Sequence, residues 1–370
     1  MLRYRSVVML ASVIVSLVCI FNMGFAYAWE HTMSSQVSLE YESNPAMTTT
    51  SSAGVWRGIF EPNYAVLGRY GQDEIKSGIS VLFARSSNEI LRANRSSPSM
   101  FLDWLRQTES AEFGMSSRYA EASTRDAVFD GTGQVPVNSM RASRIISGRI
   151  SKAFSVRSTL SGDAAYEGVS YQGGNFVDYA TRTENMTYSY VWSETNAPYL
   201  QLTHTDYLPN DGITLTTFTN TVTLGTNSRF SDAIDGNVHV GRSKVGNADF
   251  SIQGGGSIQY SGLRDRLVLN VNRQVTPSGL GGFITSDQII GSWNYALSEA
   301  SNIGVDLGWQ SSRFVAATMN TNAGVWQQQR INSAWGTRTY YRRNTVSGEL
   351  IETVFSNTLG INFSYTNTDF

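Results

Sequence analysis

The sequence predicts an all-β protein: a transmembrane antiparallel β-barrel of about 18 strands, with 16 strands as the alternative. Three observations lead to this fold class. Segments of about ten residues alternate apolar and polar side chains. Charged residues make up only 16% of the chain, whereas aromatic residues reach 12%. Short turns alternate with longer loops, an asymmetry that a water-soluble β-sandwich or propeller has no reason to show.

The chain begins with a segment typical of a Sec-type signal peptide. Basic residues precede an apolar run over residues 7–21, and the small residues Ala26 and Ala28 mark a cleavage site. A retained membrane anchor is the alternative, but the run is short for a membrane span. We therefore expect residues 1–28 to be removed and residues 29–370 to form one outer-membrane β-barrel.

The composition narrows the possible classes further. Cys19, the one cysteine, lies in the signal segment, so we expect the exported protein to contain no disulfide. The chain has 28 basic and 30 acidic residues, which gives no basic surface for nucleic acid. After residue 28 no apolar run approaches the ~18 residues that a membrane helix needs.

Alternating strands follow one another along the chain. The clearest stretch, 264–309, contains three strands, in which Trp293, Tyr295 and Trp309 lie on the apolar faces and are expected in an interfacial aromatic girdle. The other predicted strands are 36–42, 63–70, 74–85, 98–107, 112–121, 144–151, 156–166, 183–192, 199–207, 215–225, 236–241, 251–261, two within 322–345, and 355–365.

Two of these strands carry alternatives. Residues 100–107 could form a helix instead. At the other end of the chain, Phe370 does not share the parity of the apolar positions between Leu359 and Tyr365. Either the last strand ends near Tyr365, or a bulge shifts its register.

Longer loops are predicted at every second connection. They cover residues 43–53, 88–97, 126–138, 167–178, 208–212 and 276–283. In a membrane barrel, long loops lie outside the cell and short turns lie in the periplasm. The Gly- and Pro-containing segment 126–138 is the candidate for a loop that folds into the lumen and forms a constriction.

Several short motifs resemble those of a known family. They are Asn44-Pro45 at the end of an early strand, the turn from Arg273 to Gly281 with its Pro-Ser-Gly, and the Leu297-Ser298-Glu299 turn. With these motifs, and Glu167–Tyr171 at a similar strand end, the chain resembles the outer-membrane β-barrel porin type 2 family. The resemblance implies an outer-membrane barrel that accompanies exopolysaccharide synthesis and export.

We expect no catalytic, cofactor-binding or metal site. A barrel hydrolase needs a nucleophile or an activated water beside a histidine held by an acid or amide, and no such pattern surrounds His31, His204 or His239. By parity, His204 is expected at the outer rim and His239 in the lumen. Three scattered histidines without cysteines provide no metal-ligand spacing.

The side chains of the predicted lumen are the ones that a passing solute would contact. They are polar and of mixed charge, which either wets a pore or offers a sliding polymer many weak hydrogen bonds. By parity the inward residues are Arg149, Arg157, Asp163, His239, Arg266, Asn270, Asn272, Ser292, Asn294, Asp306 and Gln310.

Three functions are compatible with this barrel. The leading hypothesis is a passive conduit for exopolysaccharide, and the alternative is a general or small-solute diffusion porin. A barrel enzyme or a structural or adhesion scaffold is the third. The expected location is the Gram-negative outer membrane after Sec-type export. The expected partners are outer-membrane lipid, the barrel-assembly machinery, and exopolysaccharide with periplasmic export components, but no nucleic acid.

Overall fold

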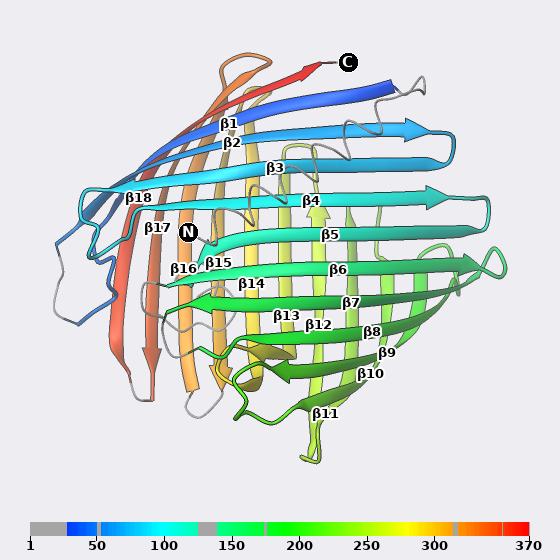
Figure 1. The fold of residues 1–370 in the computed structure, drawn as a ribbon. Coiled ribbons are helices and arrows are strands. Elements are labelled where there is room, and N and C mark those ends of the chain that lie inside the picture. Colours follow the sequence, from blue (N-terminus) through cyan, green and yellow to red (C-terminus); the bar gives the residue numbers. More distant parts are fainter. Residues whose placement is uncertain are drawn as a thin grey trace, which may run out of the picture.

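The protein forms a single closed β-barrel. The computed structural model describes residues 28–49, 53–124, 139–173, 176–313, 317–349 and 351–369. Each strand pairs antiparallel with the next along the chain, and β1 also pairs with β18. Blue β1 and red β18 therefore lie side by side (Figure 1). The predicted 18-stranded antiparallel barrel is confirmed.

The strands are longer than the sequence pattern indicated, because most continue beyond their alternating cores. Their bounds are β1 Ala28–Glu42, β2 Val55–Tyr70, β3 Asp73–Ser86, β4 Arg95–Gln107, β5 Ala111–Ser123, β6 Met140–Ala153, β7 Ser158–Gln172, β8 Tyr179–Tyr190, β9 Asn196–Pro209, β10 Thr217–Arg229, β11 Ile234–Val245, β12 Phe250–Ser261, β13 Asp265–Ser278, β14 Gly282–Ser298, β15 Ser301–Arg313, β16 Ala317–Arg330, β17 Trp335–Gly348 and β18 Ile351–Asp369.

The two ends of the barrel differ in their connections. At one end the strands are joined by brief turns, such as residues 71–72 and 299–300, and this end also carries the first residues of β1. The longer connections all meet at the opposite end, among them residues 43–54 and 210–216. The alternation of short turns and long loops predicted from the sequence holds in the first half of the barrel. After β11 the connections at both ends are short, such as residues 279–281 between β13 and β14.

Each strand presents one apolar and one polar face. Met186, Leu202 and Val222 lie directly opposite one another on β8, β9 and β10 and are about half exposed. The neighbouring row consists of Asn185, Thr203 and Thr221. Directly paired residues point to the same side of a sheet, so the apolar row faces outward and the polar row faces the lumen.

The structure decides the two strands for which the sequence left alternatives. Residues 100–107 form part of strand β4 and not a helix. The last strand neither ends near Tyr365 nor shifts its register there, because β18 pairs with β1 without interruption from Thr358 to Asp369. The pairing with β1 stabilises this polar tail, since backbone groups on the side of β1 gain ladder partners. Within the described residues, the chain contains no helix that is long and apolar enough to cross a membrane.

Candidate functional site: the lumen and its mouth

Most of the predicted inward residues lie in strands with the register that the prediction required. Arg149 is directly opposite Asp163, Arg266 is opposite Asn294, and Ser292 is opposite Asp306. All are on the face opposite the exposed apolar residues. The strand residues placed on this face are Arg149, Asp163, His239, Arg266, Asn270, Asn272, Ser292, Asn294, Asp306 and Gln310.

Arg157 is the exception among the predicted lumen residues. It lies in the turn between β6 and β7, because β7 begins only at Ser158. The sequence pattern extended the strand across this turn, since Val156 shares the parity of Ser158 and Leu160. Arg157 is therefore exposed at the short-turn end and does not line the barrel wall.

The charges on the inner wall are largely paired with one another. Arg149 Nη2 lies 2.8 Å from Glu112 Oε1, and Arg69 bridges Glu30 at 2.9 Å and Glu74 at 3.0 Å. Further inward pairs are Arg118–Asp103, Arg338–Asp306 and Arg57–Glu40. A wall of neighbouring opposite charges wets the lumen without creating a strong field of one sign.

Four aromatic residues also face the lumen, and each lies over a glycine on the adjacent strand. They are Phe101 over Gly78, Tyr199 over Gly225, Trp326 over Gly304 and Tyr340 over Gly360. A Cβ added at Gly304 would be 2.3 Å from the Trp326 ring, and one at Gly360 would be 2.3 Å from the Tyr340 ring. The missing side chain lets each ring lie against the wall instead of projecting into the lumen.

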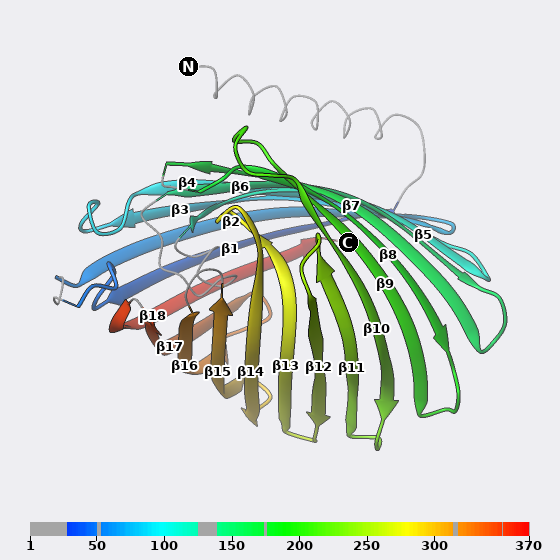
Figure 2. The same ribbon diagram turned by 90° about the horizontal axis from the view of Figure 1, so that it is seen from below.

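The long-loop end is crossed by the tip of the β13–β14 hairpin, residues 276–284, which we call the mouth hairpin. Figure 2 shows this yellow hairpin bending from its own wall toward the green strands β7–β9. The Val177 amide donates to the Gly279 carbonyl oxygen over 2.8 Å, and Tyr207 Oη donates to the Ser278 carbonyl oxygen over 3.1 Å. The contact with Tyr207 joins β13 to β9, which three strands separate in the sheet, and the contact with Val177 joins the hairpin to the loop between β7 and β8.

An aromatic cluster holds the mouth hairpin against β7–β9. Tyr179 and Tyr207 have ring centroids 5.0 Å apart, and Phe283 of the hairpin lies 5.9 Å from Tyr207. Tyr207 is fully buried, and Ile284 is 2% exposed. Burial of several large side chains around a satisfied hydroxyl makes this an attached strap and not a freely moving loop.

The hairpin tip packs closely against β7. A Cβ at Gly279 would be 2.5 Å from Tyr171 Oη, so the backbone passes directly against this tyrosine. Gly281 has φ +99°, a conformation that side-chain-bearing residues rarely adopt. Beside the cluster, Arg141 Nη2 lies 3.0 Å from Glu167 Oε1 on the facing strand. The Pro-Ser-Gly turn is therefore part of the long-loop end of the barrel.

The constriction predicted from the sequence lies in another segment than the mouth hairpin. Residues 126–138 lie outside the described part of the chain, so that prediction stays a prediction. The segment 276–283, predicted as a loop, is instead two extended strands joined by residues 279–281. The available signal was the apolar pair Phe283 and Ile284 beside a Gly-rich turn, which suits a buried tip better than an exposed loop.

A hollow of about 310 Å³ lies at the long-loop end of the barrel, where β2 approaches the loop between β3 and β4. Arg57, Arg92 and Arg95 contribute to its lining. Arg92 of that loop donates from Nε to Glu42 Oε2 over 2.8 Å and from Nη2 to Oε1 over 3.2 Å. This two-bond contact fixes the loop to the end of β1.

We expect Glu42→Gln to destabilise the protein by about 3 kcal/mol, because a buried ion pair loses one of its two charges. The Glu42 side chain is only 8% exposed and that of Arg92 only 12%. Denaturant-induced unfolding of the refolded barrel measures the change. The control is Glu112→Gln, whose carboxylate is 33% exposed beside Arg149 and whose loss should cost about 1 kcal/mol or less. Equal losses for the two variants would contradict this assignment.

His204 and His239 lie on opposite faces of the barrel wall. His204 faces outward, opposite Glu184 and Asn220, and its Nδ1 lies 2.7 Å from Asn220 Oδ1. His239 faces the lumen opposite Gly225. Among the residues that the structure describes, no group of three or more His, Cys, Asp or Glu side chains could hold a metal ion.

Comparison with known proteins gives similarity of structure only. No family model and no curated protein sequence matches the chain. Among solved structures, OpdK of Pseudomonas aeruginosa matches with a TM-score of 0.54 at 11% identity, over 92% of this chain and 99% of OpdK. OpdQ of the same organism matches with a TM-score of 0.51 at 9% identity, over 92% of this chain and 99% of OpdQ. OccK9 (OpdG), also of that organism, matches with a TM-score of 0.52 at 11% identity, over 92% of this chain and 98% of OccK9.

These similarities do not support the resemblance to the exopolysaccharide-associated type 2 family. They agree with the closed barrel, and the identities are too low to carry a substrate. OpdK is named an outer membrane protein. The chain therefore has the fold of outer-membrane porins, a closed antiparallel barrel of 18 strands.

Proposed function

We propose that this protein is a passive diffusion channel for small polar solutes in the Gram-negative outer membrane. The observation that carries the proposal is the combination of a polar inner wall with a mouth hairpin attached across one end. The apolar outer face supplies the membrane surface, and a barrel of this size holds an aqueous lumen. Passage down a gradient through such a lumen requires no catalytic group.

The inner wall favours polar solutes without a strong preference for one charge. Its acidic and basic side chains alternate in pairs such as Arg118–Asp103 and Arg338–Asp306. Between them lie hydroxyl and amide groups, including Asn185, Thr203 and Asn270. Such groups exchange hydrogen bonds with water and solute at little net cost, which permits passage instead of tight binding.

The mouth hairpin favours small solutes over a polysaccharide chain. It reaches from β13–β14 across to β7–β9 through Gly279 and Ser278, so it covers part of the opening that a wide polymer would need. One solved OpdK structure contains vanillate, a small aromatic carboxylate, which agrees with this size class for that protein. Exopolysaccharide export, the function expected from the family resemblance, would require the hairpin to leave the aromatic cluster that buries it.

Swelling of liposomes that contain the refolded full-length chain tests the proposal. Sugars of increasing size, from a pentose through di- and trisaccharides to dextran oligomers, are applied outside the vesicles. We expect swelling rates to fall steeply with solute size, because the mouth hairpin sets the narrowest opening. Protein-free liposomes are the control, and absence of swelling with the pentose would contradict the proposal.

A further inference from the structure

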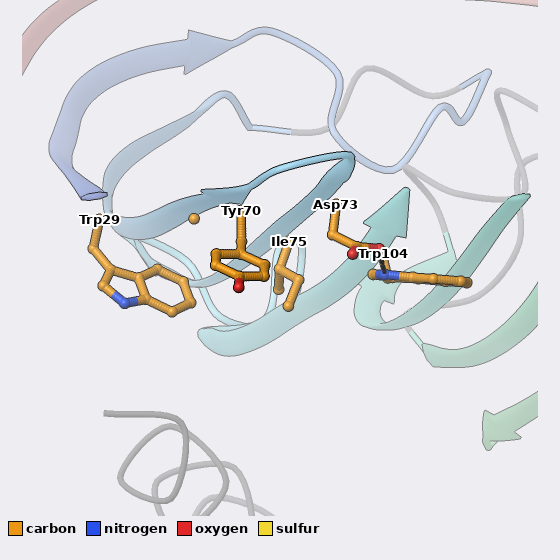
Figure 3. A pocket seen from close by; sticks show the side chains of 6 residues that line it. Trp29, Tyr70, Asp73, Ile75 and Trp104 are labelled. Carbon is orange, nitrogen blue, oxygen red and sulfur yellow. Dashed lines mark hydrogen bonds between the residues drawn. The ribbon is translucent and has the colours of Figure 1, made fainter. Parts of the chain in front are cut away.

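The outer surface of the barrel carries a hollow at its short-turn end that the channel does not use. Its volume is about 220 Å³, and it is lined by Trp29, Gly68, Tyr70, Asp73, Ile75 and Trp104. In Figure 3 the labelled side chains project from the same side of strands β1–β4, with Asp73 between the tyrosine and Trp104. All of these positions are on the apolar, outward face.

The strand register explains why a hollow forms here. Trp29, Gly68, Ile75 and Trp104 lie in one row across β1, β2, β3 and β4. Gly68 has no side chain, and the Trp29 ring occupies the space where a Cβ would be, 2.4 Å away. The glycine thus forms the floor, and the two tryptophans stand on either side of the strand pair that carries it.

A pair of opposite charges borders the hollow. Tyr70 is directly opposite Asp73, and Asp73 is directly opposite Arg106 in the next row. Asp73 Oδ1 accepts a hydrogen bond from Trp104 Nε1 over 3.0 Å and lies 3.8 Å from Arg106 Nε. The Arg106 side chain is 51% exposed, so its guanidinium group is accessible from the membrane side.

We propose that this hollow binds the headgroup of a zwitterionic phospholipid with a primary ammonium, of the phosphatidylethanolamine type. Aromatic rings next to a carboxylate attract an ammonium group, and Trp29, Tyr70 and Trp104 line the hollow together with Asp73. Arg106 presents a guanidinium group to the neighbouring phosphate. Asp73 and Arg106 lie directly opposite each other on neighbouring strands, so the carboxylate and the guanidinium group are side by side, as the ammonium and phosphate groups are in the headgroup.

The position of the hollow agrees with a lipid occupant. Short turns of membrane barrels face the periplasm, where the inner leaflet meets the barrel. Farther along the same outward face, Met33, Ile79 and Leu102 are 59%, 47% and 47% exposed and offer an apolar surface to acyl chains. The inference requires that the barrel lies in a membrane, but not that it conducts solute.

Native mass spectrometry of the refolded full-length chain tests the site. The protein in detergent is given equimolar phosphatidylethanolamine and phosphatidylglycerol of the same acyl chains. We expect the wild-type protein to retain more phosphatidylethanolamine. Asp73→Asn and Trp104→Leu should each lower its affinity for that lipid about tenfold, with little change for phosphatidylglycerol. Tyr70→Leu, an exposed rim position, is a second aromatic variant with the same expectation.

The matched control is Asp265→Asn. Asp265 also faces outward at the short-turn end, directly opposite Tyr295, but it does not line the hollow. Equal retention of both lipids by the wild-type protein, or an equal loss in the Asp265 variant, would overturn the inference. A heat-modifiable band on an SDS gel shows that each variant has folded. Liposome swelling should stay unchanged in all of these variants, so failure of this inference is distinct from failure of the channel.

Discussion

Removal of the mouth hairpin is expected to widen the channel. In this variant residues 276–284 are replaced by Asn-Gly, which closes β13 and β14 with a tight hairpin turn. We expect single-channel conductance in planar bilayers to rise about twofold or more, because conductance follows the narrowest part of a pore. The size limit for liposome swelling should shift toward larger sugars in the same variant.

A point substitution provides an intermediate case. Gly281→Val places a β-branched residue at φ +99°, which strains the turn by about 1–3 kcal/mol and weakens its attachment to β7–β9. Gly148→Val is the control, because Gly148 faces outward and an added Cβ there would have no atom within 4 Å. Unchanged conductance after removal of the whole hairpin would show that it does not restrict the opening.

A substitution at Gly304 is expected to narrow the lumen from the wall. The Trp326 ring lies against this glycine, 2.3 Å from the position of an added Cβ. Gly304→Val should therefore displace the ring into the lumen and lower conductance by about half, since a projecting indole occupies the path of ions and water. Overpacking of this kind should also cost about 1–3 kcal/mol of stability.

The second half of this experiment identifies the ring as the cause. In the double variant Gly304→Val/Trp326→Ala, conductance should return to the wild-type value or exceed it. Gly324→Val is the matched control, because Gly324 faces the lumen on the neighbouring strand and no aromatic ring covers it. A decrease in conductance of equal size in the control, or in the double variant, would contradict the position of the Trp326 ring against Gly304.

The sequence predicted the barrel because alternation is a local property. Residues 264–309 show it most clearly, and β13, β14 and β15 follow the predicted faces, with Trp293, Tyr295 and Trp309 outward. Ten of the eleven residues predicted for the lumen are in strands, on the face opposite the exposed apolar side chains. Arg157 is in a turn instead, because a turn can preserve the parity of the strands on either side.

The arrangement of the mouth and of the inward aromatic residues could not be predicted in this way. Trp326 can face a polar lumen because Gly304 lies directly opposite it, and that pairing depends on the register between two strands. The contact of Ser278 with Tyr207 depends on curvature across three intervening strands. Neither register nor curvature is contained in the local pattern of apolar residues.

The most direct test of the central claim is the swelling of liposomes that contain the wild-type chain. A small-solute channel with a hairpin across its mouth predicts rapid swelling with a pentose, slower swelling with a trisaccharide and none with dextran oligomers. Equal rates for the pentose and the oligomers would contradict a restricted mouth. No swelling with any solute would contradict the channel itself.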